Sequence, residues 1–533
     1  MANRNDEYRF GTLPTKSMPR SAFKMQHSLS TSLNTGRIIP IYWKEVLPGD
    51  SFKMKVSELV RMTTPINPVM SNGYIDTYFF SVPWRLTDEH WEEFMGENKD
   101  DAWTQRREFI VPQVTSPEGG WIKGSLASYF GVRTYTEGIS WDAKWLRAYA
   151  LIYNKWFRNE NVTEPVEIPL GQETTYGSNG DDPVTDIVKG GMPAKAVKFA
   201  SYLTRALPEP QKGDSVFLPL GDTAPVIFDQ TSPEGETYTG KQAQLRQLVE
   251  YGNRPMAVGY TSENEVLPVN TVVNLNADLK EATAGTINQL RQAFAIQRLL
   301  ELDAVGGTEY RELLRAHFKV TSPDSRLQIP EYLGGKRVPI NISEVSATAE
   351  SAGGPLGTEG AHSKTIDNEQ YIEGAFVEHG CIIGLAVIRT EHEYQQRIER
   401  SFSRHSRLDY YFPELANLGN QSILNKEIFA QGTSEDDEVF GYQEAWAEYR
   451  FEDNIVTGEL NSDYPLALDN WTWADKYESL PTLSDEWIKE TDVNVQRTLA
   501  IENQDQFIAN FYFESTWYRP LPIYSIPSLT GWH

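Results

Sequence analysis

The residue types that most often perform catalysis or hold metals are scarce and poorly spaced in this sequence of 533 residues. It has eight histidines, none of them paired at metal-ligand spacing, and His392-Glu393 lacks the second histidine of a zinc-protease motif. The single cysteine, Cys381, lies in the apolar run 380–388, which is typical of a buried strand. No nearby cation would stabilise its thiolate, so we expect Cys381 to be structural and unreactive.

Three short motifs match known chemistry only in part. Residues 235–241 have the glycine and lysine spacing of a phosphate-binding loop, but Gln242 replaces the Ser or Thr that would hold Mg²⁺. Residues 21–24 fit Ser-x-x-Lys, a weak pattern by itself, and the acidic run 435–438 lacks the alternating ligands of a calcium loop. We therefore predict no catalytic, cofactor-binding or metal-binding residues and no cofactor.

Charge is unevenly distributed along the chain. The net charge of −25 argues against a protein that wraps duplex DNA with its whole surface. Residues 1–37 hold six basic and two acidic residues, a net of +4, whereas residues 433–494 hold three basic and 17 acidic ones, a net of −14. A weakly cationic arm on an acidic body predicts two faces that meet different partners.

Length and composition set the outer limits of the fold. The chain exceeds the usual size of one hydrophobic core, so two domains or one core with long excursions are both compatible with it. The 14 Trp and 26 Tyr exceed what one core needs and favour contact surfaces. One cysteine forms no intrachain disulfide, and neither a membrane-spanning run nor a signal-peptide core is evident. We expect a soluble protein that is made and used in a cytoplasm.

Most of the first hundred residues form short β-type runs separated by turns. Residues 51–62 alternate apolar and polar side chains, and the run 74–83 has strand composition and ends at a proline. Such spacing favours a sandwich or barrel over βαβ units. Apolar stripes predict helices as insertions, over 142–158 and 284–303, with a short one through 313–314.

Three segments do not fit a packed core. Residues 221–283 are rich in turn formers and hold nine acidic against four basic residues, which predicts an exposed projection. A flexible loop is expected over 346–360. The proline-rich tail 519–527 is incompatible with a helix interior or a central strand. It predicts an extended arm that lies on a neighbouring subunit.

A set of longer motifs is distributed in a fixed order along nearly the whole chain. In the N-terminal half they are IPIY (39–42), EVLPGD (45–50), FSVPWRL (80–86), FMGE (94–97), RAY (147–149) with WFR (156–158), PQKG (210–213) and INQLRQAF (287–294). In the C-terminal half they are SPDSRLQ (322–328), PEYLGG (330–335), VEHG (377–380), YFPE (411–414), LNKEI (424–428), VFGYQE (439–444), WAEYR (446–450) and RPLP (519–522). This ordered set resembles the major capsid proteins of gokushoviruses, a group of the Microviridae. Residues 221–283 and 528–533 depart from the family pattern.

The resemblance implies a mainly β fold: an eight-stranded antiparallel jelly roll of the viral capsid type, with long loop and helical insertions. It implies an extended basic N-terminal arm over 1–37 and a jelly-roll domain over 38–533. Within that domain we expect a surface protrusion at 221–283 and an extended C-terminal arm over 515–533. Many copies would form a T=1 icosahedral shell around a circular single-stranded DNA phage genome. The protein would belong to a virion assembled in the bacterial host cytoplasm.

The cationic arm is predicted to face the genome and to contact phosphates without reading sequence. The candidate DNA-facing residues are Arg4, Arg9, Lys16, Arg20 and Lys24. A disordered, solvated terminus is the alternative for this arm. Because +4 is a small charge, we expect a separate, small basic DNA-packaging protein to neutralise most of the DNA.

Two further partners follow from the resemblance, together with one rival interpretation. A pilot protein of the same virus would accompany the shell, and the protrusion at 221–283 would contact a host-surface receptor. The rival class is an acidic β-rich protein that binds or hydrolyses glycans, suggested by the Trp count and the abundant carboxylates. That class predicts a monomer or small oligomer with a carboxylate cleft.

Overall fold

The computed structural model divides the chain into two compact units, residues 1–208 with 322–533, and residues 209–321. The residues that it describes are 20–96, 109–214, 216, 226–228, 241–242, 244–251, 254–260, 275–277, 287–306, 312, 314–318, 328–346, 348, 356–357, 359–501 and 504–524.

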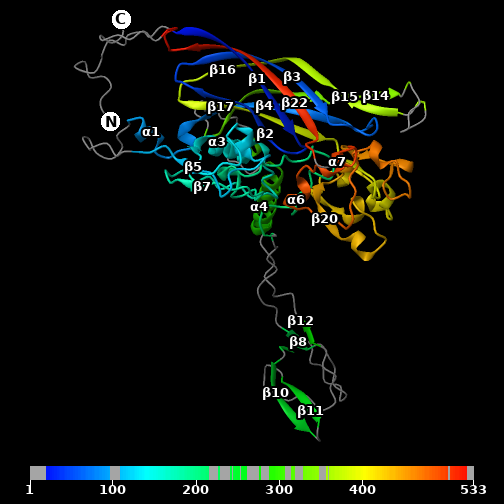
Figure 1. The fold of residues 1–533 in the computed structure, drawn as a ribbon. Helices are drawn as coiled ribbons and strands as arrows, with labels where there is room; N and C mark the ends of the chain where they lie inside the picture. The colour runs from blue at the N-terminus through cyan, green and yellow to red at the C-terminus, as the bar shows by residue number, and fades with distance from the viewer. Residues whose placement is uncertain are drawn as a thin grey trace, which may run out of the picture. The chain divides into compact units, whose positions relative to one another are not determined.

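Two four-stranded antiparallel sheets form the body of the larger unit (Figure 1). The first sheet, in spatial order, is β1 (Ser21–Leu33), β22 (Phe507–Arg519), β3 (Ser51–Met62) and β16 (Thr365–Ala375). The second is β13 (Glu331–Pro339), β4 (Gly73–Pro83), β17 (Gly380–Thr390) and β2 (Ile39–Val46). Every neighbouring pair in the two sheets is antiparallel, so the predicted mainly β, antiparallel class is confirmed.

The main hydrophobic core lies between these two sheets. Side chains alternate across a strand, so every second residue of β3 and β22 points into the core. In β22, for example, Phe511, Phe513 and Trp517 are buried, and the Trp517 ring stacks on Phe52 of β3 with 4.9 Å between centroids. Residues from the second sheet that complete this core include Ile41, Ile75, Phe79, Ile382 and Ala386.

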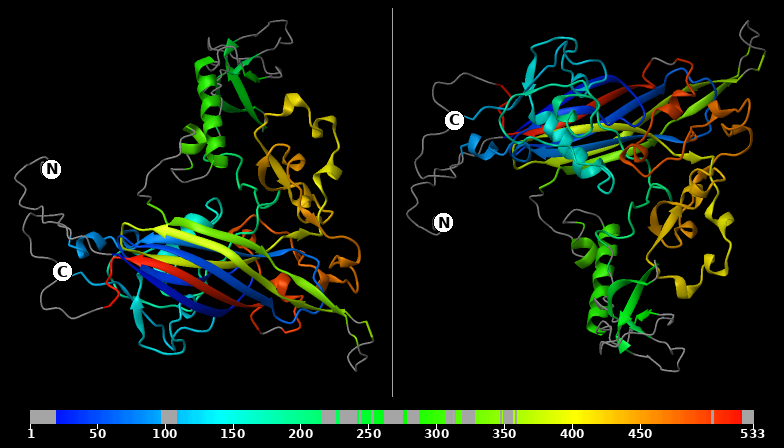
Figure 2. Two further views of the ribbon diagram at one scale, coloured as in Figure 1. Left: turned by 90° about the horizontal axis from the view of Figure 1, so that it is seen from above. Right: turned by 90° about the horizontal axis from the view of Figure 1, so that it is seen from below.

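The second sheet is buried on its other face as well. Cys381, Ile383, Leu385 and Val387 of β17 belong to a second core with α2 (Leu126–Tyr129) and α3 (Lys144–Ile152). Figure 2, in its right-hand view, shows these cyan segments over that side of the sandwich. The prediction of a structural Cys381 in a buried strand is confirmed.

Helix α3 occupies the region where residues 142–158 were predicted to be helical. It continues from Lys144–Ile152 into a π-helical turn, Tyr153–Phe157. Its buried Leu146, Ala148 and Tyr149 face the second core, and the Tyr149 hydroxyl donates a 2.6 Å hydrogen bond to the Ile38 carbonyl. The apolar stripe in the sequence therefore marks a covering helix of the second sheet.

Shorter elements of the larger unit pack around the sandwich. The strands are β5 (Gln113–Thr115), β6 (Ser140–Asp142), β7 (Thr175–Tyr176), β14 (Ile342–Ser346), β15 (Glu359–Ser363), β18 (Glu393–Tyr394), β19 (Asn420–Leu424), β20 (Val439–Glu444) and β21 (Asn454–Ile455). The helices are α1 (Trp91–Phe94), α6 (Asp485–Ile488) and α7 (Val493–Gln496). A third core, built on Leu203, Tyr394, Ile423 and Ile488, holds the 394–488 region together.

The smaller unit contains a β-hairpin, a short sheet and a helix. The hairpin pairs β10 (Gln244–Tyr251) with β11 (Arg254–Tyr260), and the sheet has the order β12-β8-β9. The strands of that sheet are β8 (Val226–Phe228), β9 (Lys241–Gln242) and β12 (Leu275–Ala277). Helix α4 (Ile287–Gly306) stands where a helix over 284–303 was predicted, and a π-helical turn, Leu314–Phe318, follows it. The excursion predicted at 221–283 lies within this unit.

Part of each predicted arm forms a strand of the first sheet. Residues 21–33 of the arm predicted at 1–37 form β1, because Phe23, Met25 and Leu29 pack against the core. Residues 515–519 of the arm predicted at 515–533 are the last part of β22, which lies between β1 and β3. In β1 the apolar residues alternate with Ser, Thr and Gln, which weakens its composition signal. Those two portions are therefore strands of the first sheet, and the arms over 1–37 and 515–533 otherwise stay predictions.

Candidate nucleic-acid interface

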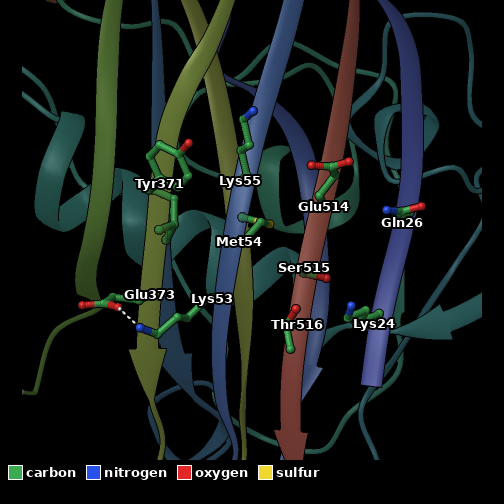
Figure 3. Close-up of a pocket in the computed structure, with 11 residues that line it drawn as sticks. Lys24, Gln26, Lys53, Met54, Lys55, Tyr371, Glu373, Glu514, Ser515 and Thr516 are labelled. Carbon is green, nitrogen blue, oxygen red and sulfur yellow. Dashed lines mark ion pairs between the residues drawn. The ribbon is translucent and has the colours of Figure 1, made fainter. Parts of the chain in front are cut away.

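The outer face of the first sheet presents polar side chains that point away from the core (Figure 3). The strand register arranges them in rows that cross all four strands. One row is Lys24, Thr516, Lys53 and Glu373, and the next is Gln26, Glu514, Lys55 and Tyr371. Together with neighbours they line a shallow hollow of about 730 Å³.

Cations on this face are only partly neutralised. Lys53 Nζ lies 3.4 Å from a carboxylate oxygen of Glu373, but both side chains are about three-quarters exposed, so this pair is weak. Lys24 and Lys55 have no ion-pair partner among the residues that the structure describes. Their charges remain available to an anionic ligand.

Two of the five predicted DNA-facing residues lie on this face. Arg20 donates from Nη2 to Ser51 Oγ at 2.8 Å and to the Tyr518 carbonyl at 3.2 Å, at the edge where β1 begins. Lys24 follows on the outer side of β1. Arg4, Arg9 and Lys16 lie outside the described residues.

Three basic residues of the same face were missed by the sequence reasoning. Lys53, Lys55 and Arg61 occupy the outward positions of β3, between its buried apolar residues. The alternation over 51–62 predicted the strand and carried this signal too. The alternation does not show which side of the strand is covered, because the covering elements come from distant parts of the chain.

Aromatic rings accompany these cations. Tyr371, Tyr512 and Tyr518 are 72%, 36% and 44% exposed, all on outward positions of β16 and β22. An exposed tyrosine ring offers a flat apolar surface that can stack on a nucleobase or be buried by another protein. The face therefore combines the two residue types that recognise single-stranded nucleic acid.

A cluster of buried charges lies directly after β17 but is closed to ligands. His392 Nδ1 is 2.9 Å from Asp475 Oδ2, and His392 Nε2 is 3.1 Å from Glu490 Oε2. Burial alone would lower the pKa of His392, but the two carboxylates raise it to about 9. Lys198 Nζ adds a second cation 3.6 Å from Asp475. All four side chains are nearly inaccessible, so this cluster joins chain segments and has no route to a substrate.

Glu58 is a second unusual acid, on the inner side of β3. Its side chain is buried between the sheets, and neither carboxylate oxygen has a hydrogen-bond partner in the structure. Burial, reinforced by the nearby Asp367, raises the pKa of Glu58 to about 8. A carboxyl group held in this way is protonated at neutral pH.

A cavity lined by several acidic residues has two of its buried carboxylates paired with arginines. It measures about 310 Å³ and includes Glu427 and Asp453. Glu427 accepts from Tyr202 Oη at 2.8 Å and from Arg400 Nη1 at 3.1 Å, while Asp453 accepts from Arg397 Nη1 at 2.7 Å. Each carboxylate thus has a fixed arginine partner, unlike a pair that shares protons with a substrate.

The weaker motifs have structural explanations where the structure describes them. Asp436 accepts hydrogen bonds from the backbone of Gln431 and Gly432, and Asp437 pairs with Lys426, so the run 435–438 caps a local turn. Burial raises the pKa of the Cys381 thiol well above its ordinary value. Among the described residues, no three or more His, Cys, Asp or Glu side chains are placed so that they could hold a metal ion. Residues 235–240 of the phosphate-loop-like motif lie outside them.

Comparisons with known proteins give the class of the molecule. The family model described as capsid protein (F protein) matches residues 11–529. The chain therefore belongs to this family of phage capsid proteins, and it is a virion component.

Its relatives are capsid proteins VP1 of three phages. It is 40% identical over 530 residues to that of Spiroplasma virus 4, with 96% of each chain covered. It is 35% identical to that of Bdellovibrio phage phiMH2K, over 100% of this chain and 99% of the relative. It is 34% identical to that of Chlamydia phage 1, over 98% and 97%. The resemblance to gokushovirus major capsid proteins is confirmed.

Within the described part of the chain, no helix has the length and apolar character needed to cross a membrane.

Proposed function

We propose that this chain is the major capsid protein that assembles, in many copies, into a T=1 icosahedral shell around a circular single-stranded DNA genome. Membership in the phage capsid family and nearly full-length likeness to three capsid proteins support this role. They also argue against an enzyme and against the glycan-binding alternative. Assembly in the bacterial host cytoplasm belongs to the same proposal.

The observation that carries the proposal is the nested pairing of the eight strands in the two four-stranded sheets. In chain order the first pairs with the last, β1 with β22, and the second with the seventh, β2 with β17. The third pairs with the sixth, β3 with β16, and the fourth with the fifth, β4 with β13. Two four-stranded sheets nested in this way are the expected arrangement of a jelly roll, the fold used by many capsid subunits.

The polarity of the subunit in the shell is part of the proposal. Residues 1–37, with Arg4, Arg9, Lys16, Arg20 and Lys24, would face the genome, where their net charge of +4 favours phosphate. The acidic insertion at 221–283 would form an exterior protrusion that contacts a host-surface receptor. Since the arm neutralises little DNA, a small basic packaging protein would share the interior, and a pilot protein would accompany the shell.

Sedimentation and negative-stain microscopy of the purified protein test the shell. We expect closed particles of tens of subunits, whose nucleic acid resists nuclease until the particles are opened and is then cut by a single-strand-specific enzyme. A monomer or small oligomer as the final species would contradict the proposal. Antibodies raised against residues 221–283 should bind intact particles, and failure to bind a well-formed shell would contradict the exterior position.

A further inference from the structure

We propose that the outer face of the first sheet is a binding platform for single-stranded DNA, with lysines contacting phosphates and tyrosines stacking on bases. This proposal rests on the proposed function, because it assumes a subunit that encloses single-stranded DNA. It goes further by assigning the contact to an ordered sheet surface and to residues of β3, β16 and β22.

The first argument is charge complementarity. Five basic residues occupy this face, namely Arg20, Lys24, Lys53, Lys55 and Arg61. Its acidic residues on outward positions are Glu369, Glu373 and Glu514. The face is therefore net +2 in a chain whose net charge is −25. A cationic area on such an acidic protein attracts a polyanion to that area in preference to the rest of the surface.

The second argument is the alternation of rings and cations along the strands. The Tyr518 row comes first, the rows containing Lys24, Lys53 and Lys55 follow, and the Tyr512 row comes next. Tyr512 and Tyr518 are six positions apart on β22, which corresponds to about 20 Å along an extended strand. Rings at both ends with cations between them match a nucleic-acid strand whose bases stack while its phosphates pass over the lysines.

The third argument is that the tyrosine rings are accessible. Tyr512 is paired across the strands with Ser28 on one side and Ser57 on the other, and Tyr518 with Ala22 and Ser51. Neighbours this small leave the Tyr512 ring open, whereas beside Tyr518 the Arg20 side chain reaches across to Ser51. No described element of this unit lies in front of the sheet in the left-hand view of Figure 2.

A second copy of the chain is the alternative partner for this exposed sheet face. The centres of protein interfaces are depleted in Lys and Glu and enriched in apolar side chains. Here the centre of the face is the pair of rows that contain Lys24, Lys53, Lys55, Glu373 and Glu514. That composition favours a polyanion over a protein surface.

Binding of the full-length protein to a fluorescent oligothymidine tests the platform. For K24Q/K55Q we expect roughly tenfold weaker binding near 0.1 M salt, and a plot of log affinity against log salt that is shallower by about 1.4. The matched control R407Q/K476Q removes two exposed cations of the 394–488 region, off this face, and it should bind like the wild type. Equal losses in both pairs would overturn the proposal, because they would mean that only total charge matters.

Two further variants separate the chemistry from folding defects. Glu514 is paired with Lys55 across the strands, so E514Q removes a repulsive charge and should strengthen binding severalfold. Tyr512→Phe should bind like the wild type and Tyr512→Ala should bind more weakly, because stacking needs the ring and not its hydroxyl. Unchanged binding by E514Q, K24Q/K55Q and Tyr512→Ala would overturn the platform.

Purified particles distinguish failure of the platform from failure of the proposed function. Ultraviolet irradiation of DNA-filled wild-type particles should crosslink peptides of β22 and β16 to DNA. DNA-filled particles without such crosslinks, or with this face crosslinked only to other copies of the chain, would overturn the platform while leaving the shell function standing. Absence of DNA-filled particles would overturn the proposed function itself.

Discussion

The two sheets of the sandwich share one core but differ on their outer sides. The second sheet is covered, so β17 is buried on both faces from Gly380 to Ile388. Among the described residues, the first sheet is covered only by its partner sheet, so β22 and β3 alternate buried and exposed residues. The continuous apolar strand β17 thus marks the second sheet as a supporting sheet, buried on both faces. The alternating strands β3 and β22 mark the first sheet as a contact sheet, with one face exposed.

Adjacent alanine substitutions in the two sheets give the largest expected effect. Ile382→Ala and Ile383→Ala in β17 should each lower the free energy of unfolding by about 2–5 kcal/mol, because each side chain fills one of two cores. In β22, Phe513→Ala should cost about 3–5 kcal/mol and the adjacent Tyr512→Ala less than about 1 kcal/mol.

Urea unfolding of the purified variants measures these differences. If Ile383→Ala were as mild as Tyr512→Ala, the outer side of the second sheet would not be a packed core, and the contrast between the sheets would be lost.

The buried charge cluster around His392, directly after β17, gives a prediction for the stability contributed by buried polar groups. His392→Gln leaves the buried Asp475 and Glu490 without their shared cation and should cost about 3–5 kcal/mol near pH 7. His362→Gln, at an exposed position, is the matched control with little expected effect.

The pH dependence of stability checks the role of His392 independently. Its folded pKa of about 9 exceeds the ordinary value of 6.5, so its stabilising contribution is complete below pH 6.5 and is lost as pH rises through 9. His392→Gln should remove that alkaline loss. A wild type whose stability does not fall across this range would contradict a protonated His392.

How much of this was predictable from the sequence differs between the sheets. The apolar run around Cys381 predicted a buried strand, and the stripe of α3 predicted the helix that covers it, because both signals are local. The Ser-rich β1 was missed, and its pairing of Ser21 with Arg519 joins residues almost the whole chain apart. Lys53 and Lys55 could be placed on one side of a strand, but that no described element covers that side follows only from the three-dimensional arrangement.

Glu58 provides a smaller effect on the inner side of the contact sheet. Its folded pKa of about 8 lies above the ordinary 4.5, so the contribution of Glu58 to stability is greatest below pH 4.5 and is lost as pH rises through 8. Glu58→Gln keeps the shape without the titration and should be more stable than the wild type by about 1–3 kcal/mol above pH 8. Urea unfolding at several pH values measures this, with Glu514→Gln on the outer face of the same sheet as control. Parallel pH profiles of wild type and Glu58→Gln would contradict a buried, protonated Glu58.

Substitution of the lysines on the outer face should have the smallest effect on stability and the largest effect on contact with DNA. Replacing Lys24, Lys53 and Lys55 together by Gln should change the free energy of unfolding by no more than about 0.5 kcal/mol per residue, since all three side chains extend from the sheet into solvent and only Lys53 has an ion-pair partner among the described residues. The same variant should yield shells with less DNA, measured by the ratio of absorbance at 260 and 280 nm. A large loss of stability would mean that the lysines support the sheet itself. In that case the outer face of the first sheet would have a structural role. The distinction between a supporting sheet and a contact sheet would then be wrong.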